Sequence, residues 1–245
     1  MIRTLPLALT FLTIFPWPRR APAGPRDLAL SMLWFPGVGA LLGLVVWGAL
    51  EGLLQIFPAP VAAALTLGLL VAATRGLHLD GLADTADGVL GGATPEARLR
   101  IMKDSRVGAF GVMALVLVLL LKYTLFSVWA EGGMGPELLL FTAGSRWGMV
   151  LLAFISPYAR PEGGLGRAMT AGVTLPVAAG ATASALVLAV LVSGLSGVLL
   201  LVGAGLVVWL MSLYFKRVLG GVTGDVLGAA NEVLEVLLLA GGFLL

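Results

Sequence analysis

The sequence contains no cysteine, and only 11% of its 245 residues are charged. The lack of cysteine excludes disulfides, thiolate metal sites and cysteine nucleophiles. The small share of charge excludes an ordinary soluble domain, in which roughly 25% of residues are charged. The net charge of +2 is too small to indicate a nucleic-acid partner. The chain therefore belongs to a class of protein that needs little polar surface.

Apolar residues are abundant and make up 59% of the chain. Apolar runs of about 20 residues recur, and each is long enough to cross a bilayer core of roughly 30 Å. We therefore predict an all-α, polytopic integral membrane protein, folded as a single domain over residues 1–245, with the lipid bilayer as its surroundings. About seven transmembrane helices are expected, at residues 28–56, 59–79, 107–129, 137–156, 173–193, 196–214 and 224–244.

Four local features refine this plan. A short apolar segment at 4–15 cannot span a membrane, and we expect it to be interfacial or re-entrant. Prolines follow it where a signal peptide would have a small-residue cleavage site, so we do not predict a removable signal peptide. Pro36 and Gly37 predict a kink or a split in the first span. Ser193 and Gly194 predict a tight helical hairpin between the fifth and sixth spans.

Lysine and arginine are confined to alternate loops. The loops at 16–27, 75–106, 157–172 and 215–223 contain basic residues, whereas the loops between them and the C-terminus contain none. Cytoplasmic loops of membrane proteins are enriched in lysine and arginine. We therefore predict a multi-pass protein of the cytoplasmic (inner) membrane whose basic loops, and the active site among them, face the cytoplasm.

Two basic residues, Lys122 and Arg146, lie well inside predicted spans. Such residues are costly in lipid and usually face the interior of a helix bundle with a partner. Glu51, Glu232 and Glu235 are the candidate partners. The sequence leaves open whether these charges form a structural ion pair or contribute to function.

Five of the 13 acidic residues lie within residues 75–106, together with several bases. If Asp80 to Gly88 is helical, Asp80, Asp84 and Asp87 share one face at i, i+4 and i+7. Three carboxylates so close together repel one another, and Mg²⁺ would remove that repulsion while leaving coordination positions for phosphates. We therefore predict a magnesium site for chemistry on a pyrophosphate. The alternative is a solvated acidic helix end at the membrane surface.

The bases that follow this motif have two interpretations. Lys103 and Arg106 flank Asp104 next to the third span, and bases beside a metal site can hold phosphate oxygens. Positive charge at a cytoplasmic helix end also anchors a span, and for Arg98 and Arg100 the two interpretations have equal weight. We predict a substrate-binding role for Lys103 and Arg106.

A second polar cluster lies near the C-terminus. Asp225, Glu232 and Glu235 form one stripe of the last predicted helix, and such a stripe cannot face lipid. We expect Asp225, at the cytoplasmic end, to join the metal site or activate the nucleophile, and Glu235 to be structural. The single histidine, His78, precedes Asp80 and is either a hydrogen-bonded structural residue or a participant in proton transfer or substrate binding.

The strings GLHLDGLADTADG, IMKDSRVGAFG and GGVTGDVLGAANEVLE resemble the cobalamin synthase family of adenosylcobinamide-GDP ribazoletransferases. The resemblance extends over nearly the whole chain, through FLTIFPWP, FPGVGALLG and YARPEGGLG. It implies a membrane enzyme that joins α-ribazole, or its 5′-phosphate, to adenosylcobinamide-GDP with release of GMP. It is also compatible with a homo-oligomer or a complex with other enzymes of cobalamin synthesis.

The reaction implied by this resemblance gives each candidate residue an expected role. Mg²⁺ is the expected cofactor, held by Asp80, Asp84 and Asp87. Asp104 or Asp225 is expected to supply a further ligand or to deprotonate the attacking hydroxyl, and His78 remains a candidate catalytic residue. The expected phosphate-binding residues are Lys103, Arg106, Lys216 and Arg217.

Two rival functions have weaker support. A CDP-alcohol phosphotransferase of lipid synthesis also uses an aspartate-rich site, but no arginine follows Ala83 as the motif of that family requires. A membrane transporter is suggested by the charges inside spans. Transporters tend to place functional charge near the membrane midplane on broken, repeated helices, whereas most charge here lies at one face and the sequence contains no visible repeat.

Overall fold

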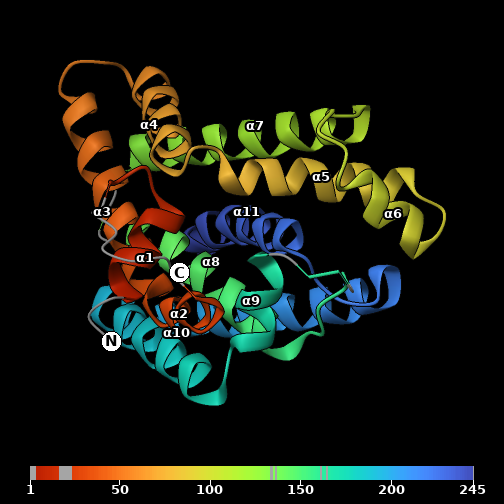
Figure 1. The fold of residues 1–245 in the computed structure, drawn as a ribbon. Coiled ribbons are helices and arrows are strands. Elements are labelled where there is room, and N and C mark those ends of the chain that lie inside the picture. Colours follow the sequence, from red (N-terminus) through yellow and green to blue (C-terminus); the bar gives the residue numbers. More distant parts are fainter. Residues whose placement is uncertain are drawn as a thin grey trace.

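The computed structural model describes residues 4–16, 24–132, 135, 137–160, 162–163 and 165–244. These residues form helices and turns without any strand, which confirms the predicted all-α membrane bundle (Figure 1). The α-helices are α1 (Thr4–Leu12), α2 (Pro25–Ser31), α3 (Phe35–Leu54), α4 (Ala59–Thr74), α5 (Leu77–Gly91), α6 (Pro95–Ile101), α7 (Ala109–Gly132), α8 (Leu138–Ile155), α9 (Leu165–Gly172), α10 (Leu175–Leu219) and α11 (Gly224–Gly241), and the 3₁₀-helices are η1 (Met32–Trp34) and η2 (Gly242–Leu244).

Four helical stretches in the described part of the chain are long and apolar enough to cross a membrane, and they are Pro25–Leu54, Ala109–Gly132, Leu138–Ile155 and Leu175–Leu219. Helices α4 and α5 are long and apolar enough to cross a membrane only when they are counted as one span, and the angle of the bend between them is 87°. The first predicted span corresponds to the stretch Pro25–Leu54, and each of the others corresponds to one helix or to one leg of α10. The number of seven crossings itself stays a prediction, because α4 is short and α11 contains three acidic residues.

Local sequence explains the breaks in these helices. Gly194 has a φ of 58° inside α10, so the predicted hairpin at Ser193–Gly194 is a reversal between two helical legs. In the first span the break falls at η1, and Pro36 lies in the first turn of α3, where its missing N–H leaves no bond unmade. The predicted span 59–79 ends early, at Thr74, because Arg75 and Gly76 both adopt left-handed backbone conformations.

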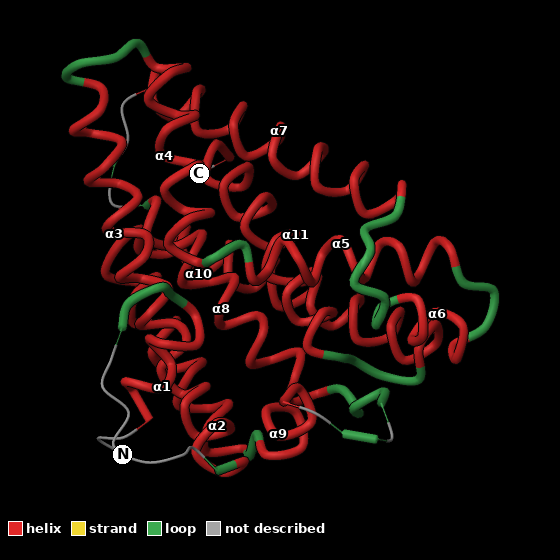
Figure 2. Tube along the Cα trace, turned by 45° about the horizontal axis from the view of Figure 1, so that its top comes forward, coloured by secondary structure: helices red, strands yellow, loops and turns green. Residues whose placement is uncertain are grey.

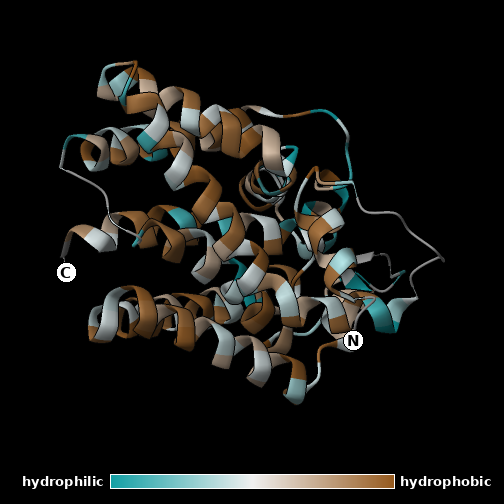
Figure 3. Ribbon diagram, turned by 90° about the vertical axis from the view of Figure 1, so that its left-hand side faces the viewer, coloured by the Kyte–Doolittle hydropathy of each residue, from teal (hydrophilic) through white to brown (hydrophobic). Residues whose placement is uncertain are grey.

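Helix α8 forms the centre of the bundle. Of its most apolar 18 residues, 78% are buried, compared with 22% for the corresponding stretches of α7 and α10. It packs against α3, α10 and α11. Gly39 and Gly43 allow the close approach of α3, since a Cβ atom at either position would collide with α8 around Thr142. Much of the ribbon is brown in Figure 3, the colour of hydrophobic residues. Many large hydrophobic residues of α7 and α10 are exposed, as expected for surfaces in contact with lipid.

Three of the four predicted cytoplasmic loops, at 75–106, 157–172 and 215–223, meet at one end of the molecule, while most of the loop at 16–27 lies outside the described residues. Figure 2 shows α6 and α9 at that end, and the α3–α4 connection with the C-terminus at the other. Lys103 of the loop after α6 forms an ion pair with Glu162, and Arg98 donates to the backbone oxygen of Val218 at the end of α10 (3.0 Å). Three loops that the charge pattern assigned to one side are therefore in contact.

Candidate functional site

The aspartate motif lies on α5, directly after the bend that separates this helix from α4. Arg75 and Gly76 have φ angles of 57° and 63°, and this pair of left-handed residues redirects the chain. The expectation that Asp80 to Gly88 is helical is confirmed, since α5 continues to Gly91. In Figure 1, α5 lies between α7 and α11 and packs against both.

Close packing of α11 on α5 brings the two distant acidic motifs together. A Cβ atom at Gly81 would collide with the backbone of Asp225, and one at Gly228 would lie 3.3–3.4 Å from the backbones of His78 and Gly81. The two glycines therefore permit a contact that larger residues would prevent. As a result, Asp225 at the start of α11 lies beside the turn of α5 that contains Asp80 and Asp84.

The acidic cluster, which we define as Asp80, Asp84 and Asp225, concentrates negative charge at this contact. Asp80 is exposed and Asp84 is half-buried. Burial is the main factor that disfavours the ionised form of the Asp84 carboxyl group. The negative charges of Asp80 and Asp225 disfavour it further, whereas the positive charge of Arg160 favours it. A bound cation would reduce the repulsion between these carboxylates.

Arg160 is a member of this site that the sequence interpretation did not single out. Its guanidinium donates to Oδ2 of Asp225 at 2.7 Å, and the two side chains are 15% and 24% exposed. In the sequence, Arg160 counted only as one of the bases of a cytoplasmic loop. The signal that could have identified it is the string YARPEGGLG, which is part of the family resemblance.

Asp87, the third predicted metal ligand, faces away from the acidic cluster. Its two carboxylate oxygens accept hydrogen bonds from the backbone N–H groups of Gly108 (2.7 Å) and Gly111 (2.8 Å) at the start of α7. A carboxylate is favourable there because the first N–H groups of a helix have no intrahelical partner. These contacts argue against Asp87 as a metal ligand and give it a structural role.

Replacing Asp87 with alanine should lower the free energy of unfolding by about 1.5–3 kcal/mol, because the buried N–H group of Gly111 and the partly buried N–H group of Gly108 lose a charged acceptor. Thermal unfolding of the detergent-solubilised protein followed by circular dichroism would measure the loss. The matched control is Asp80→Ala, which removes an exposed carboxylate from the same helix and should change stability by less than about 0.5 kcal/mol. Equal melting temperatures for the two variants would contradict the structural role of Asp87.

The predicted phosphate-binding bases occupy the same end of the molecule but differ in their partners. Lys103 is paired with Glu162, and Arg106 is paired with Asp104 at 2.7 Å; all four side chains are substantially exposed. Lys216 and Arg217 are exposed in the last turn of α10 and have no ion-pair partner among the described residues. These two bases are therefore the ones that a phosphate can reach without displacing another acid.

Asp104 is a poor candidate for the predicted general base. The neighbouring Arg106 donates to both of its carboxylate oxygens and holds the pKa of Asp104 at about 2. A carboxylate with so low a pKa has little tendency to take a proton near neutral pH. Of the two predicted bases, Asp225 is the one that lies in the acidic cluster.

His78 is buried and belongs to a different network. It is 2% exposed, and its Nδ1 atom lies 3.2 Å from Nδ2 of Asn231, which also donates to Glu235 (3.1 Å). Its other ring nitrogen has no hydrogen-bond partner in the described structure. This position argues against the predicted catalytic role of His78 and favours the structural interpretation.

The same network contains the partners of Lys122 and Arg146, the two basic residues inside predicted spans. Lys122 of α7 pairs with Glu232 (2.6 Å) and with Glu235 of α11, and Arg146 of α8 also pairs with Glu235. All four side chains are at least 95% buried. The interpretation as a structural ion-pair network is therefore supported, with Glu232 and Glu235 as partners, while Glu51 is not part of it.

No three histidine, aspartate or glutamate side chains in the described ranges are close enough together to hold a metal ion by themselves. The contacts above explain this, because Asp87 binds the start of α7 and Asp225 is paired with Arg160. Mg²⁺ is commonly bound by one or two carboxylates, with substrate phosphates and water completing its shell. Asp80 and Asp84, which have no hydrogen-bonded partner among the described side chains, fit that pattern.

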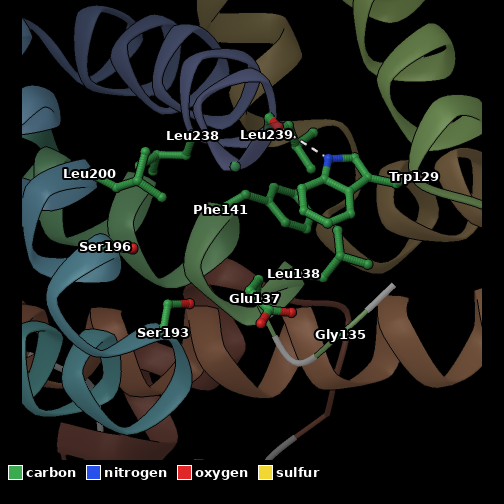
Figure 4. A pocket seen from close by; sticks show the side chains of 11 residues that line it. Trp129, Gly135, Glu137, Leu138, Phe141, Ser193, Ser196, Leu200, Leu238 and Leu239 are labelled. Atoms are coloured by element: carbon green, nitrogen blue, oxygen red, sulfur yellow. Dashed lines mark hydrogen bonds between the residues drawn. The ribbon is translucent and has the colours of Figure 1, made fainter. Parts of the chain in front are cut away.

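A cavity of about 610 Å³ lies at the end of the bundle away from the acidic cluster. It is lined by the end of α7, the start of α8, the break in α10 and the end of α11 (Figure 4). Trp129 donates to the backbone oxygen of Leu239 at its wall (3.1 Å), and Glu137 is the charged residue among those that line it. Since no base lines this cavity, it is not the predicted phosphate site.

Comparison with known proteins bears on the whole chain. The family model described as cobalamin-5-phosphate synthase matches residues 4–243. A protein of Syntrophobacter fumaroxidans named adenosylcobinamide-GDP ribazoletransferase is 45% identical over 238 residues, which cover 95% of each chain. Proteins with the same name from Pseudomonas putida (strain W619) and Desulfitobacterium hafniense are 42% and 40% identical, over 96% and 99% of this chain and 96% and 97% of theirs. No solved structure matches this chain.

Proposed function

The chain belongs to the cobalamin-5-phosphate synthase family of membrane enzymes, and from this premise we propose that it transfers α-ribazole, or α-ribazole 5′-phosphate, to adenosylcobinamide-GDP. A ribose hydroxyl attacks the phosphorus that bears the cobinamide. A new P–O bond forms there, the bond from this phosphorus to the bridging oxygen breaks, and GMP leaves. The product is adenosylcobalamin or its 5′-phosphate.

The observation that carries this proposal is the acidic cluster at the contact of α5 and α11, where Arg160 pairs with Asp225. We assign Asp80 and Asp84 to Mg²⁺, which would neutralise charge on the pyrophosphate as GMP leaves. Asp225 is the preferred residue to accept the proton of the attacking hydroxyl or to supply a further ligand. Its exposed fraction of 24% allows a substrate hydroxyl to reach it.

The bases are assigned to the phosphates. Lys216 and Arg217 lie at the end of α10, a few residues before Asp225, and have no competing acid among the described residues. Lys103 and Arg106 would exchange Glu162 and Asp104 for phosphate oxygens. Because those pairs are exposed, each is weak, and the exchange costs little.

We further propose that the site faces the cytoplasm from the inner membrane. The support is the distribution of lysine and arginine, since three of the four basic loops meet at the end of the molecule that contains the acidic cluster. A homo-oligomer, or a complex with other enzymes of cobalamin synthesis, stays a prediction from the family resemblance.

The rival functions make different predictions for the same purified protein. A CDP-alcohol phosphotransferase would consume CDP-linked lipids, and a transporter would move a substrate across proteoliposomes without releasing GMP. Neither is favoured by the relatives, which share one name over nearly their full lengths.

In the decisive experiment, the protein purified in detergent is mixed with adenosylcobinamide-GDP and α-ribazole or its 5′-phosphate, and GMP is measured by chromatography. We expect GMP release that requires both substrates and Mg²⁺, and that stops when EDTA is added. Release of GMP without the ribazole would indicate a hydrolase instead. Consumption of CDP-linked lipids in a parallel reaction, with no GMP released, would overturn the proposal.

A further inference from the structure

We propose that Arg160 is an internal counter-cation of the acidic cluster, which neutralises Asp225 in the absence of metal and binds a phosphate oxygen of the substrate when the cation is present. This inference rests on the proposed function and adds to it a coupling between metal and substrate. Its physical basis is the arrangement of one positive side chain among several negative ones.

The contacts of Arg160 leave it able to serve two partners. One terminal nitrogen, Nη2, donates to Asp225 at 2.7 Å, while the other terminal nitrogen, Nη1, has no hydrogen bond in the described structure. A guanidinium has five N–H donors in a planar fork, so an unused donor beside a pyrophosphate site can take a second acceptor.

The backbone around Arg160 is fixed by the turn that precedes α11. The N–H of Ala159 donates to the oxygen of Val222 (2.9 Å), and the N–H of Val222 donates to the oxygen of Pro157 (2.8 Å). Gly221 lies within this turn with a φ of 156°, and a Cβ atom there would collide with Pro157. These hydrogen bonds join the segment before Arg160 to the turn before α11. Arg160 can therefore change its partner by moving its side chain while the backbone stays in place.

Asp225 is held from the other side by its own helix start. Thr223 accepts a hydrogen bond from the N–H of Val226 (3.2 Å) as the N-cap of α11, and its hydroxyl donates to Oδ2 of Asp225 (3.3 Å). The oxygen that Arg160 binds is therefore the one that Thr223 positions. Oδ1 of Asp225 has no such hydrogen bond in the described structure and stays available.

A competition follows from this geometry. A divalent cation that approaches the acidic cluster without substrate must compete with the guanidinium for Asp225 and is repelled by its charge. When a pyrophosphate arrives as well, its oxygens offer Arg160 a charge-assisted partner, and the competition is relieved. Metal and substrate should therefore each increase the affinity for the other, since such a coupling is reciprocal.

The test measures metal binding without substrate, using Mn²⁺ and the electron paramagnetic resonance signal of the free ion, on the full-length protein in detergent. We expect Arg160→Gln to bind Mn²⁺ about tenfold more tightly than the wild type, as removal of about 1.4 kcal/mol of competition would produce. The same variant should show a KM for adenosylcobinamide-GDP that is at least about tenfold higher, because a charged phosphate contact is lost. The matched control, Arg26→Gln, removes an exposed base of α2 from the same predicted face and should change neither quantity.

A second variant separates this role from a purely structural one. Arg160→Lys keeps the charge but loses the fork, so Mn²⁺ binding should stay near the wild-type value while the KM rises. If Arg160→Gln retains wild-type thermal unfolding but binds Mn²⁺ no more tightly, the counter-cation role is wrong. If Arg160→Gln does not fold, Arg160→Lys provides the test. The role is then wrong if Arg160→Lys binds Mn²⁺ about tenfold more tightly than the wild type, because the retained charge should keep the affinity near the wild-type value. Because Mn²⁺ binding needs no substrate, its result is independent of whether the wild type releases GMP.

Discussion

Replacement of Asp84 with asparagine is expected to reduce the rate of GMP release by roughly 10³-fold, while expression and membrane insertion stay unchanged. Asparagine has nearly the same shape as aspartate but lacks the negative charge that holds a divalent cation. Loss of metal-based charge stabilisation costs several kcal/mol of the barrier, and each 1.36 kcal/mol corresponds to a tenfold change in rate. The measurement is the initial rate of GMP release at saturating Mg²⁺.

The matched control for Asp84→Asn is Glu96→Gln. Glu96 is an exposed acid on α6, at the same end of the molecule, and lies outside the acidic cluster. Its replacement should leave the rate within about twofold of the wild type, as is usual for exposed positions. A near-normal rate for Asp84→Asn, with Mg²⁺ still required, would defeat the assignment of Asp84 to the metal.

The second large effect is expected for stability. Replacing Glu235 with leucine should destabilise the protein by about 3–5 kcal/mol, because a buried charge that loses its partner cannot be solvated. Glu235 is the carboxylate shared by Lys122 and Arg146, and without it Arg146 has no acidic partner among the described residues. The melting temperature of the detergent-solubilised protein would report the loss.

The double variant Glu235→Leu with Arg146→Met provides the matched comparison. Replacing a buried ion pair by apolar residues of similar size is often neutral or stabilising, so the second substitution should recover most of the loss. Lys122 would keep its contact with Glu232. If the single variant melts at the wild-type temperature, the network does not stabilise the contact between α7, α8 and α11.

Sequence periodicity was sufficient for the parts of the site that depend on one helix. The spacing of Asp80 and Asp84 predicts their common face, and α5 provides it. The same spacing includes Asp87, yet its carboxylate binds the N-terminus of α7. That contact depends on where α7 begins relative to α5, and no local pattern contains this information.

The remaining differences also come from tertiary contacts. The charge of Arg160 is explained by the positive-inside pattern alone. Its position beside Asp225 depends on the backbone hydrogen bonds between the 157–160 segment and the turn before α11, which no local pattern predicts. His78 lies two residues before Asp80 in the sequence, but packing against α11 places it in the buried network of Asn231 and Glu235. In contrast, Gly194 carried enough local information to predict the hairpin of α10.

The most direct test of the central claim is cleavage of the protein by a bound redox-active metal. Fe²⁺ would replace Mg²⁺ in the wild-type protein, ascorbate and peroxide would be added, and the fragments would be mapped by mass spectrometry. If the cation binds at the contact of α5 and α11, cuts should appear both near residues 80–84 and near residue 225, and excess Mg²⁺ should suppress both. Cuts at one segment alone, or cuts that Mg²⁺ does not suppress, would contradict a cation site at this contact.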